Sequence, residues 1–277
     1  MSNYGIENFP RFQRLGVTEE DIKILKAEKV REAFIEVKDD MSQLTWQLAP
    51  GIKDGRWSAI LGDDVSGRLV ANIVGEVASR YAQEHEQPAP KRYFFAGGTI
   101  PYDDPQIMSW SRDAESEKVR ERQALLQQYI DKISNNLGKH VLIVTEQIRN
   151  GSTINRIGAA LKAKGIDFDV ASMWIRDTIE EQKRQFNSRN PDTFKDAMMY
   201  GGRENAGASD PFSSEVSAVF YNLGRVLSDA TGVKKTAINP ASKINNEADR
   251  DLVILAREES SKLADELYQE VFRTKTV

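Results

Sequence analysis

One segment of the sequence combines the residue types that bind a phosphate group with the spacing that would present them together. The apolar run 141–144 is followed by a polar stretch, 145–153, that contains Glu146 and Gly151. Glycine takes backbone conformations that other residues avoid, and it allows a ligand to approach the main chain closely. We expect a helix from Thr153, and free N–H groups at a helix start attract an anion, as does the helix dipole. The segment therefore predicts a phosphate site between a strand and a helix.

The side chains of this segment suit a phosphorylated sugar. Arg149 offers positive charge, and Asn150, Ser152 and Thr153 offer hydrogen-bond donors. Glu146 is expected at the carboxyl end of a strand, where ligands bind in open α/β sheets, and could accept hydrogen bonds from sugar hydroxyls. The segment lacks the Gly-Lys-Ser/Thr of a Walker loop and the three spaced glycines of a dinucleotide-binding loop. An ordinary strand-to-helix turn with a polar rim remains an open alternative.

A second connection of the same kind occurs earlier in the chain. The short, mostly apolar run 57–62 is followed by residues 63–68, and apolar residues at helical spacing begin at Val70. On its own residues this connection is explained by simple helix capping, in which Asp64 or Ser66 caps the helix and Asp63 interacts with the dipole.

These two loops, in this order, resemble those of the type I phosphoribosyltransferase family. The family signature is an apolar strand, two acids, two variable residues and a loop such as Thr-Thr-Gly-Gly-Thr, and residues 141–153 match it here. The match has one departure, because Thr145 occupies the position of the first acid and carries no charge. The resemblance covers about residues 57 to 175. It implies a phosphoribosyltransferase of nucleotide metabolism that uses 5-phosphoribosyl 1-pyrophosphate and Mg²⁺, transfers phosphoribose to a nitrogen acceptor such as a nucleobase, and releases pyrophosphate.

The resemblance also implies roles for individual residues. Glu146 would hold the ribose hydroxyls and Arg68 would meet the leaving pyrophosphate, which makes these two the expected catalytic residues. Mg²⁺ would be held mostly by substrate and water, and no protein ligand for it is predicted. Some members of this fold act as regulators that sense ribose phosphates, so a catalytically weak or inactive sensor is the alternative function. The expected substrate-binding residues are Asp64, Val65, Ser66, Gly67, Thr145, Arg149, Asn150, Gly151, Ser152 and Thr153.

The elements that would position these loops are visible in the apolar pattern. Strands are expected at 57–62, 93–96, 140–144 and 168–174, and helices after the first and third of them, which makes a right-handed βαβ unit. We therefore predict an α/β fold with an open, mainly parallel sheet flanked by helices, phosphoribosyltransferase-like, with N- and C-terminal helical additions. The predicted regions are an N-terminal helical extension at 1–50, interrupted at Pro50, a core at 51–180, and a hood-like and C-terminal helical region at 181–277. Residues 97–116 are expected to be a loop over the site, and residues 200–203 a further loop in which Arg203 could contact the acceptor.

Composition restricts the other possibilities. The 277 residues include no cysteine and two histidines, which excludes disulfides and cysteine nucleophiles and leaves little material for a His-rich metal site. The net charge of −4 provides no overall basic field, so we expect no nucleic-acid partner. No apolar run approaches the ~20 residues of a membrane span, and the expected location is the cytoplasm. The resemblance also makes a homodimer an expectation.

Overall fold

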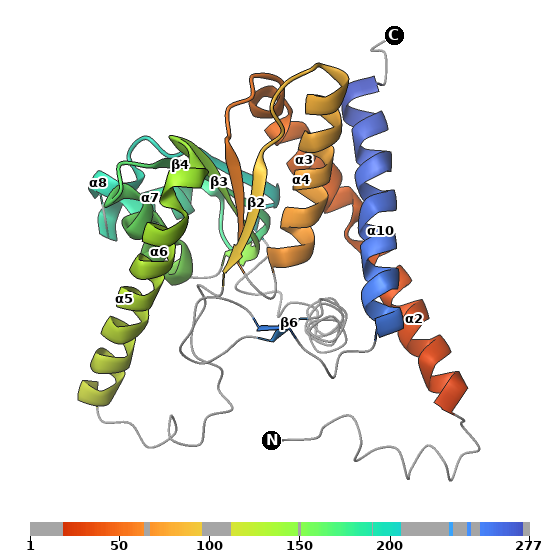
Figure 1. The fold of residues 1–277 in the computed structure, drawn as a ribbon, viewed down its shortest axis with the longest axis horizontal. Helices are drawn as coiled ribbons and strands as arrows, with labels where there is room; N and C mark the ends of the chain where they lie inside the picture. Colours follow the sequence, from red (N-terminus) through yellow and green to blue (C-terminus); the bar gives the residue numbers. More distant parts are fainter. Residues whose placement is uncertain are drawn as a thin grey trace.

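The computed structural model describes residues 19–63, 67–95, 112–148, 151–189, 191–205, 233–234, 243–244 and 250–273. Five parallel strands form an open sheet in the order β2-β1-β3-β4-β5 (Figure 1). This sheet, flanked by helices, confirms the predicted α/β class and the parallel pairing. The strands are β1 (Ala59–Asp63), β2 (Lys91–Phe95), β3 (His140–Ile148), β4 (Asp167–Ile175) and β5 (Met199–Arg203).

Helices cover both faces of the sheet (Figure 1). On one face lie α3 (Lys38–Lys53) and α4 (Gly67–Glu84), with α2 (Glu19–Glu36) and α10 (Arg250–Tyr268) packed on them; α10 continues into a short π-helix, η2 (Gln269–Arg273). The other face carries α5 (Arg112–Leu137), α6 (Ser152–Lys162), α7 (Ile179–Arg189) and the short α8 (Pro191–Phe194). A separate two-stranded ribbon joins β6 (Val233–Lys234) to β7 (Lys243–Ile244).

The apolar pattern explains why the central strands are covered on both sides. Successive side chains of a strand point to opposite faces, and β3 has apolar residues at every position from 141 to 144. Val141 and Ile143 pack with α5 and α6, whereas Leu142 and Val144 pack with α4. The apolar run is continuous because its residues are buried alternately in two cores, one on each side of the sheet.

The strand order creates a switch point between β1 and β3. The chain leaves β1 through α4 and returns in β2 on one side, and it leaves β3 through α6 and returns in β4 on the other. Ligands of open α/β sheets bind where the order reverses, at the carboxyl ends of the strands. Both loops singled out from the sequence begin at this point.

Three expectations about local structure were wrong. Residues 112–116, expected to belong to a loop, begin α5, and the rest of that expected loop, up to residue 111, lies outside the described residues. Residues 199–203 form β5 and not a loop, because they pair with β4 on one side, and on the other the side-chain amide of Gln47 pairs with both the N–H and the carbonyl of Gly201. Gly202 allows α3 to approach, since a Cβ there would collide with the carbonyl oxygen of Asp40. The helix α3 also continues through Pro50 to Lys53.

The helices at the two ends of the described chain pack on the same core. The α10 helix contacts α4, α2 and α3, and its last turn is anchored to α4 by a shared carboxylate. Tyr268 donates a hydrogen bond of 2.5 Å to Glu84, and Arg273 donates one of 2.7 Å to the same oxygen. Within the described ranges, no helix has the length and apolar character needed to cross a bilayer.

Candidate functional site

The carboxyl end of β3 extends further than the apolar run indicated. The pairing with β4 continues from Val144 to Ile148, which places Thr145 inside the sheet with only 4% of its surface exposed. Glu146 and Gln147 follow it and are half-buried. Strand alternation puts Glu146 on the face of Val144, which is the face covered by α4. A carboxylate therefore lies at the strand end, as the sequence predicted.

Gly151 connects this strand end to α6 in a conformation that glycine favours. Its φ is 68° and its ψ is 6°, and its carbonyl accepts the first helical hydrogen bond, from the N–H of Asn155 at 2.9 Å. A Cβ at this position would also collide with the ring of Phe186 on α7. Both the backbone conformation and the packing therefore require glycine, and Ser152 and Thr153 begin the helix directly after it. Arg149 and Asn150 lie outside the described residues.

The loop after β1 lies against the same part of β3. Gly67 begins α4, and a Cβ on it would lie 2.8 Å from the carbonyl oxygen of Val144 and 3.0 Å from the Cα of Thr145. The start of α4 thus touches the backbone of β3 just before Glu146. Asp64, Val65 and Ser66 lie outside the described residues, so their roles as ligands or helix caps stay predictions. The structure does bring the described ends of the two predicted loops together.

Arg68 lies on the β2 side of this switch point. Its guanidinium carbon is 4.2 Å from the centre of the Phe94 ring, a cation–π contact near the end of β2. Phe94 in turn packs on Gly62, where a Cβ would be 2.8 Å from the ring. The side chain is half-buried, and its planar group rests on the ring of Phe94, which holds the guanidinium at the end of β2.

Two charged residues at the switch point were not identified as site residues from the sequence. Asp63 is the last residue of β1 and is buried, and Arg156 is half-buried in the second turn of α6. Burial lowers the pKa of the Arg156 guanidinium and the Asp63 carboxylate raises it, so the two charges act on each other. The available sequence signal was an arginine between Ile154 and Ile157, on a helix whose other inward positions are apolar.

The described residues do not form a protein cage for a metal ion. No three side chains of His, Asp or Glu in those ranges are close enough to one another to hold one. Glu146 is the one acid among the predicted site residues that the structure describes. Because Mg²⁺ keeps several waters and takes phosphate oxygens from its substrate, the carboxylate of Glu146 would suit a magnesium ion that arrives with a pyrophosphate.

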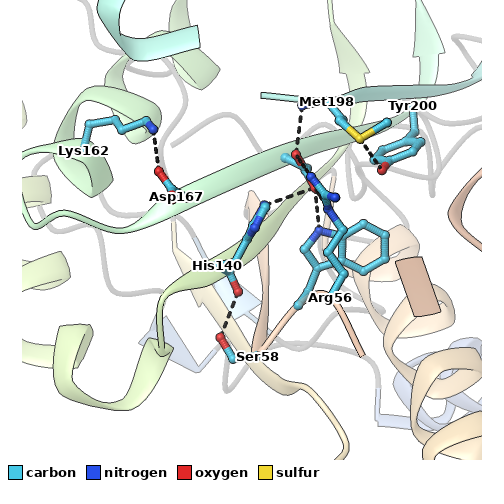
Figure 2. A network of polar contacts seen from close by, with 9 residues as sticks. Arg56, Ser58, His140, Lys162, Asp167, Met198 and Tyr200 are labelled. Carbon is cyan, nitrogen blue, oxygen red and sulfur yellow. Dashed lines mark hydrogen bonds and ion pairs between the residues drawn. The ribbon is translucent and has the colours of Figure 1, made fainter. Parts of the chain in front are cut away.

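A second polar cluster lies at the opposite, amino edge of the sheet (Figure 2). Asp169 in β4 is fully buried, and it accepts hydrogen bonds from Arg56 Nε at 2.7 Å, from Trp57 Nε1 at 2.8 Å and from the N–H of Met198 at 2.8 Å. His140 Nε2 lies 3.1 Å from the same carboxylate. These donors come from the start of β3 and from the segments before β1 and β5. The cluster therefore fastens the strand starts together, far along the strands from the candidate site.

Comparison with known proteins identifies no relative of this chain: no family model, no curated protein and no solved structure matches it.

Proposed function

We propose that this protein binds a phosphoribosyl compound at the switch point between β1 and β3, and that it is a phosphoribosyltransferase. One observation supports this above the others. The start of α4 at Gly67 rests on the backbone of Val144 and Thr145, so the described ends of two strand-to-helix connections lie side by side, next to Glu146. Two helix starts at one place suit a ligand with two separate phosphate groups, and 5-phosphoribosyl 1-pyrophosphate is such a ligand.

Each of the two loops would bind a different phosphate group of the ligand. The loop 149–153 would bind the 5′-phosphate, and Glu146 would accept hydrogen bonds from the ribose hydroxyls. The loop 64–67 and Arg68 would bind the pyrophosphate, together with a Mg²⁺ ion carried by the substrate. Displacement of pyrophosphate by a nitrogen acceptor passes through a transition state with positive charge on the sugar, so the work of the protein would be positioning and charge stabilisation.

A sensor with the same ligand is the second candidate, and Thr145 favours it. The family signature that this chain resembles has an acid at that position, but here a neutral hydroxyl is buried in the sheet. A threonine can donate one hydrogen bond, yet it cannot balance positive charge on the sugar. A site that binds the ligand and turns it over slowly, or not at all, would be the result.

Calorimetric titration with 5-phosphoribosyl 1-pyrophosphate and Mg²⁺ tests the binding claim. We expect the wild type to bind, and Glu146→Gln to bind more weakly by about ten- to a hundredfold, since a charge-assisted hydrogen bond contributes roughly 1.5–3 kcal/mol. Glu180→Gln on α7, an exposed carboxylate outside the site, is the matched control and should bind like the wild type. A wild type that does not take up the ligand would refute the proposal.

A second experiment separates the transferase from the sensor. The protein is incubated with 5-phosphoribosyl 1-pyrophosphate, Mg²⁺ and a panel of purine and pyrimidine bases, and products are followed by mass spectrometry and by pyrophosphate release. A new nucleotide with stoichiometric pyrophosphate identifies the enzyme and its acceptor. Ligand that binds and is recovered unchanged with every base would favour the sensor.

A further inference from the structure

We propose that Arg156, oriented by Asp63, is a phosphate-binding residue of the switch-point site. This inference rests on the proposed function, because it assigns a further residue to the same ligand. Neither residue belongs to the loops that the signature identifies. Both emerge as candidates because the ends of β1 and β3 lie side by side and α6 covers the same face of the sheet.

The position of Asp63 follows from strand register. Gly62 of β1 pairs with Val144 of β3, so the next residues along, Asp63 and Thr145, are neighbours across the two strands. They also share a face, because Leu61 and Ile143, two residues earlier in each strand, both pack into the core beneath α5 and α6. The carboxylate of Asp63 therefore lies on the strand beside Thr145, the residue that replaces the first acid of the family signature.

The α6 helix places Arg156 over that face. Side chains on an α-helix lean toward its N-terminus, and Arg156 lies in the second turn, so it leans back toward Gly151 and the phosphate loop. Gln123 of α5 donates a hydrogen bond of 3.3 Å to the carbonyl oxygen of Arg156, so this turn of α6 lies against α5 on the same face of the sheet. Burial lowers the pKa of the guanidinium and the Asp63 carboxylate raises it, so the two charges interact. The positive charge is thus held on the face of the sheet that Asp63 and Thr145 share.

The chemistry of arginine suits this place. A guanidinium carries five N–H donors in a fixed plane and stays charged when it is half-buried, so it can bond one carboxylate and still present donors to a phosphate. Asp63 would fix the plane of the group before a ligand arrives, which lowers the cost of binding. In this arrangement Asp63 is a positioning residue and Arg156 is the one that touches phosphate oxygen.

The test compares ligand affinity in Arg156→Gln, Arg156→Lys and the wild type. Calorimetry is run with 5-phosphoribosyl 1-pyrophosphate and Mg²⁺, then with pyrophosphate and with ribose 5-phosphate as separate probes. We expect Arg156→Gln to weaken the full ligand by about ten- to a hundredfold and Arg156→Lys to weaken it less. If only pyrophosphate or only ribose 5-phosphate binds more weakly to Arg156→Gln, that probe carries the phosphate group that Arg156 contacts.

A matched control comes from the amino edge of the sheet. Arg56 makes an ion pair with a buried aspartate, Asp169, outside the site. Arg56→Gln should lower the melting temperature without changing the affinity for any probe. Asp63→Asn should weaken the full ligand less than Arg156→Gln, because the guanidinium remains but loses its orientation.

The outcomes separate this inference from the proposed function. If the wild type binds and both Arg156 variants bind equally well, Arg156 is only a structural ion pair and this inference fails alone. If the wild type binds no probe, the proposed function fails and this inference fails with it. Should Arg156→Gln not fold, Arg156→Lys decides, and unchanged affinity in that variant overturns the assignment.

Discussion

A Cβ on Gly67 would lie 3.0 Å from the Cα of Thr145. Residues so far apart in the sequence meet because α4 starts immediately beside the carboxyl end of β3, with no side chain between them. This contact sets how closely the start of α4 approaches the carboxyl end of β3. It also explains why a glycine stands at the first position of α4.

Replacing Gly67 by alanine should destabilise the protein and disturb the site. The added methyl group would press on the backbone of Val144 and Thr145, which cannot rotate away as a side chain could. Overpacking of this kind costs about 1–3 kcal/mol. Urea unfolding followed by circular dichroism would measure the loss, and titration with 5-phosphoribosyl 1-pyrophosphate should show weaker binding.

Gly75→Ala is the control for that experiment, because it changes the same helix away from the site. The new methyl group would meet the side chain of Arg92, which is exposed and can move. Alanine in place of an interior helical glycine is favourable by about 1 kcal/mol, so this variant should be as stable as the wild type or more stable. An equal loss in both variants would contradict the close contact at β3.

Gly151→Ala should cost more than Gly165→Ala, although both glycines have a left-handed backbone. Their φ angles are 68° and 67°, and an alanine in this region costs about 1–2 kcal/mol. At Gly165 no described atom lies within 4 Å of the new Cβ, but at Gly151 the Cβ would collide with Phe186. We therefore expect a further loss of about 1–3 kcal/mol at Gly151.

A double-mutant cycle would identify the source of that difference. Phe186→Leu makes room for the methyl group, so Gly151→Ala should be less harmful in that background than in the wild type. Strictly additive unfolding energies for the two changes would mean that the ring of Phe186 does not restrict Gly151.

Asp169→Ala should lower the free energy of unfolding, while the candidate site of the folded protein stays intact. Its removal leaves the buried donor of Trp57, the N–H of Met198 and the charge of Arg56 without their acceptor, a loss of about 3–5 kcal/mol. Asp167→Ala in the same strand is the comparison, because Asp167 forms only an exposed pair with Lys162 at 2.6 Å (Figure 2), which contributes about 0–1 kcal/mol. Chemical denaturation of the two variants gives both values, and an Asp169 variant that is no less stable than the Asp167 variant would contradict the role of this cluster.

Stability should fall in acid because of Glu84. Its hydrogen bonds from Tyr268 and Arg273 lower the pKa of the carboxyl below the ordinary 4.5, so the folded state holds its proton less tightly than the unfolded state does. The contribution is therefore complete above about pH 4.5 and is lost as the pH falls through the lower folded value. The melting temperature of the wild type should exceed that of Glu84→Gln at neutral pH, and the gap should close as the solution becomes acidic.

A carboxylate without this anchor provides the comparison. Glu28 is exposed on α2, and Glu28→Gln should follow the wild type over the whole pH range. A gap between wild type and Glu84→Gln that stays constant down to strong acid would show that the hydrogen bonds to Glu84 do not attach α10 to α4.

The sequence by itself determined the local elements of the site. The apolar run at 141–144, the glycine at 151 and the apolar spacing after Thr153 were sufficient to predict the strand, the turn and the helix, because each depends on neighbouring residues. The same reasoning predicted a parallel sheet. It failed at β5, where Gly201 and Gly202 indicate a turn locally but lie in a strand because they pair with β4, with Gln47 bonding Gly201 as well.

Only the tertiary structure decided which residues share the site. The contact of Gly67 with β3, the pairing that sets Asp63 beside Thr145, and the placement of Arg156 above them depend on strand order and on helix packing. No residue carries information about a neighbour on another strand, because that neighbour is set by how the chain crosses over the sheet. The loops depend on neighbouring residues and could be predicted from the sequence, whereas the interaction of Asp63 with Arg156 could not.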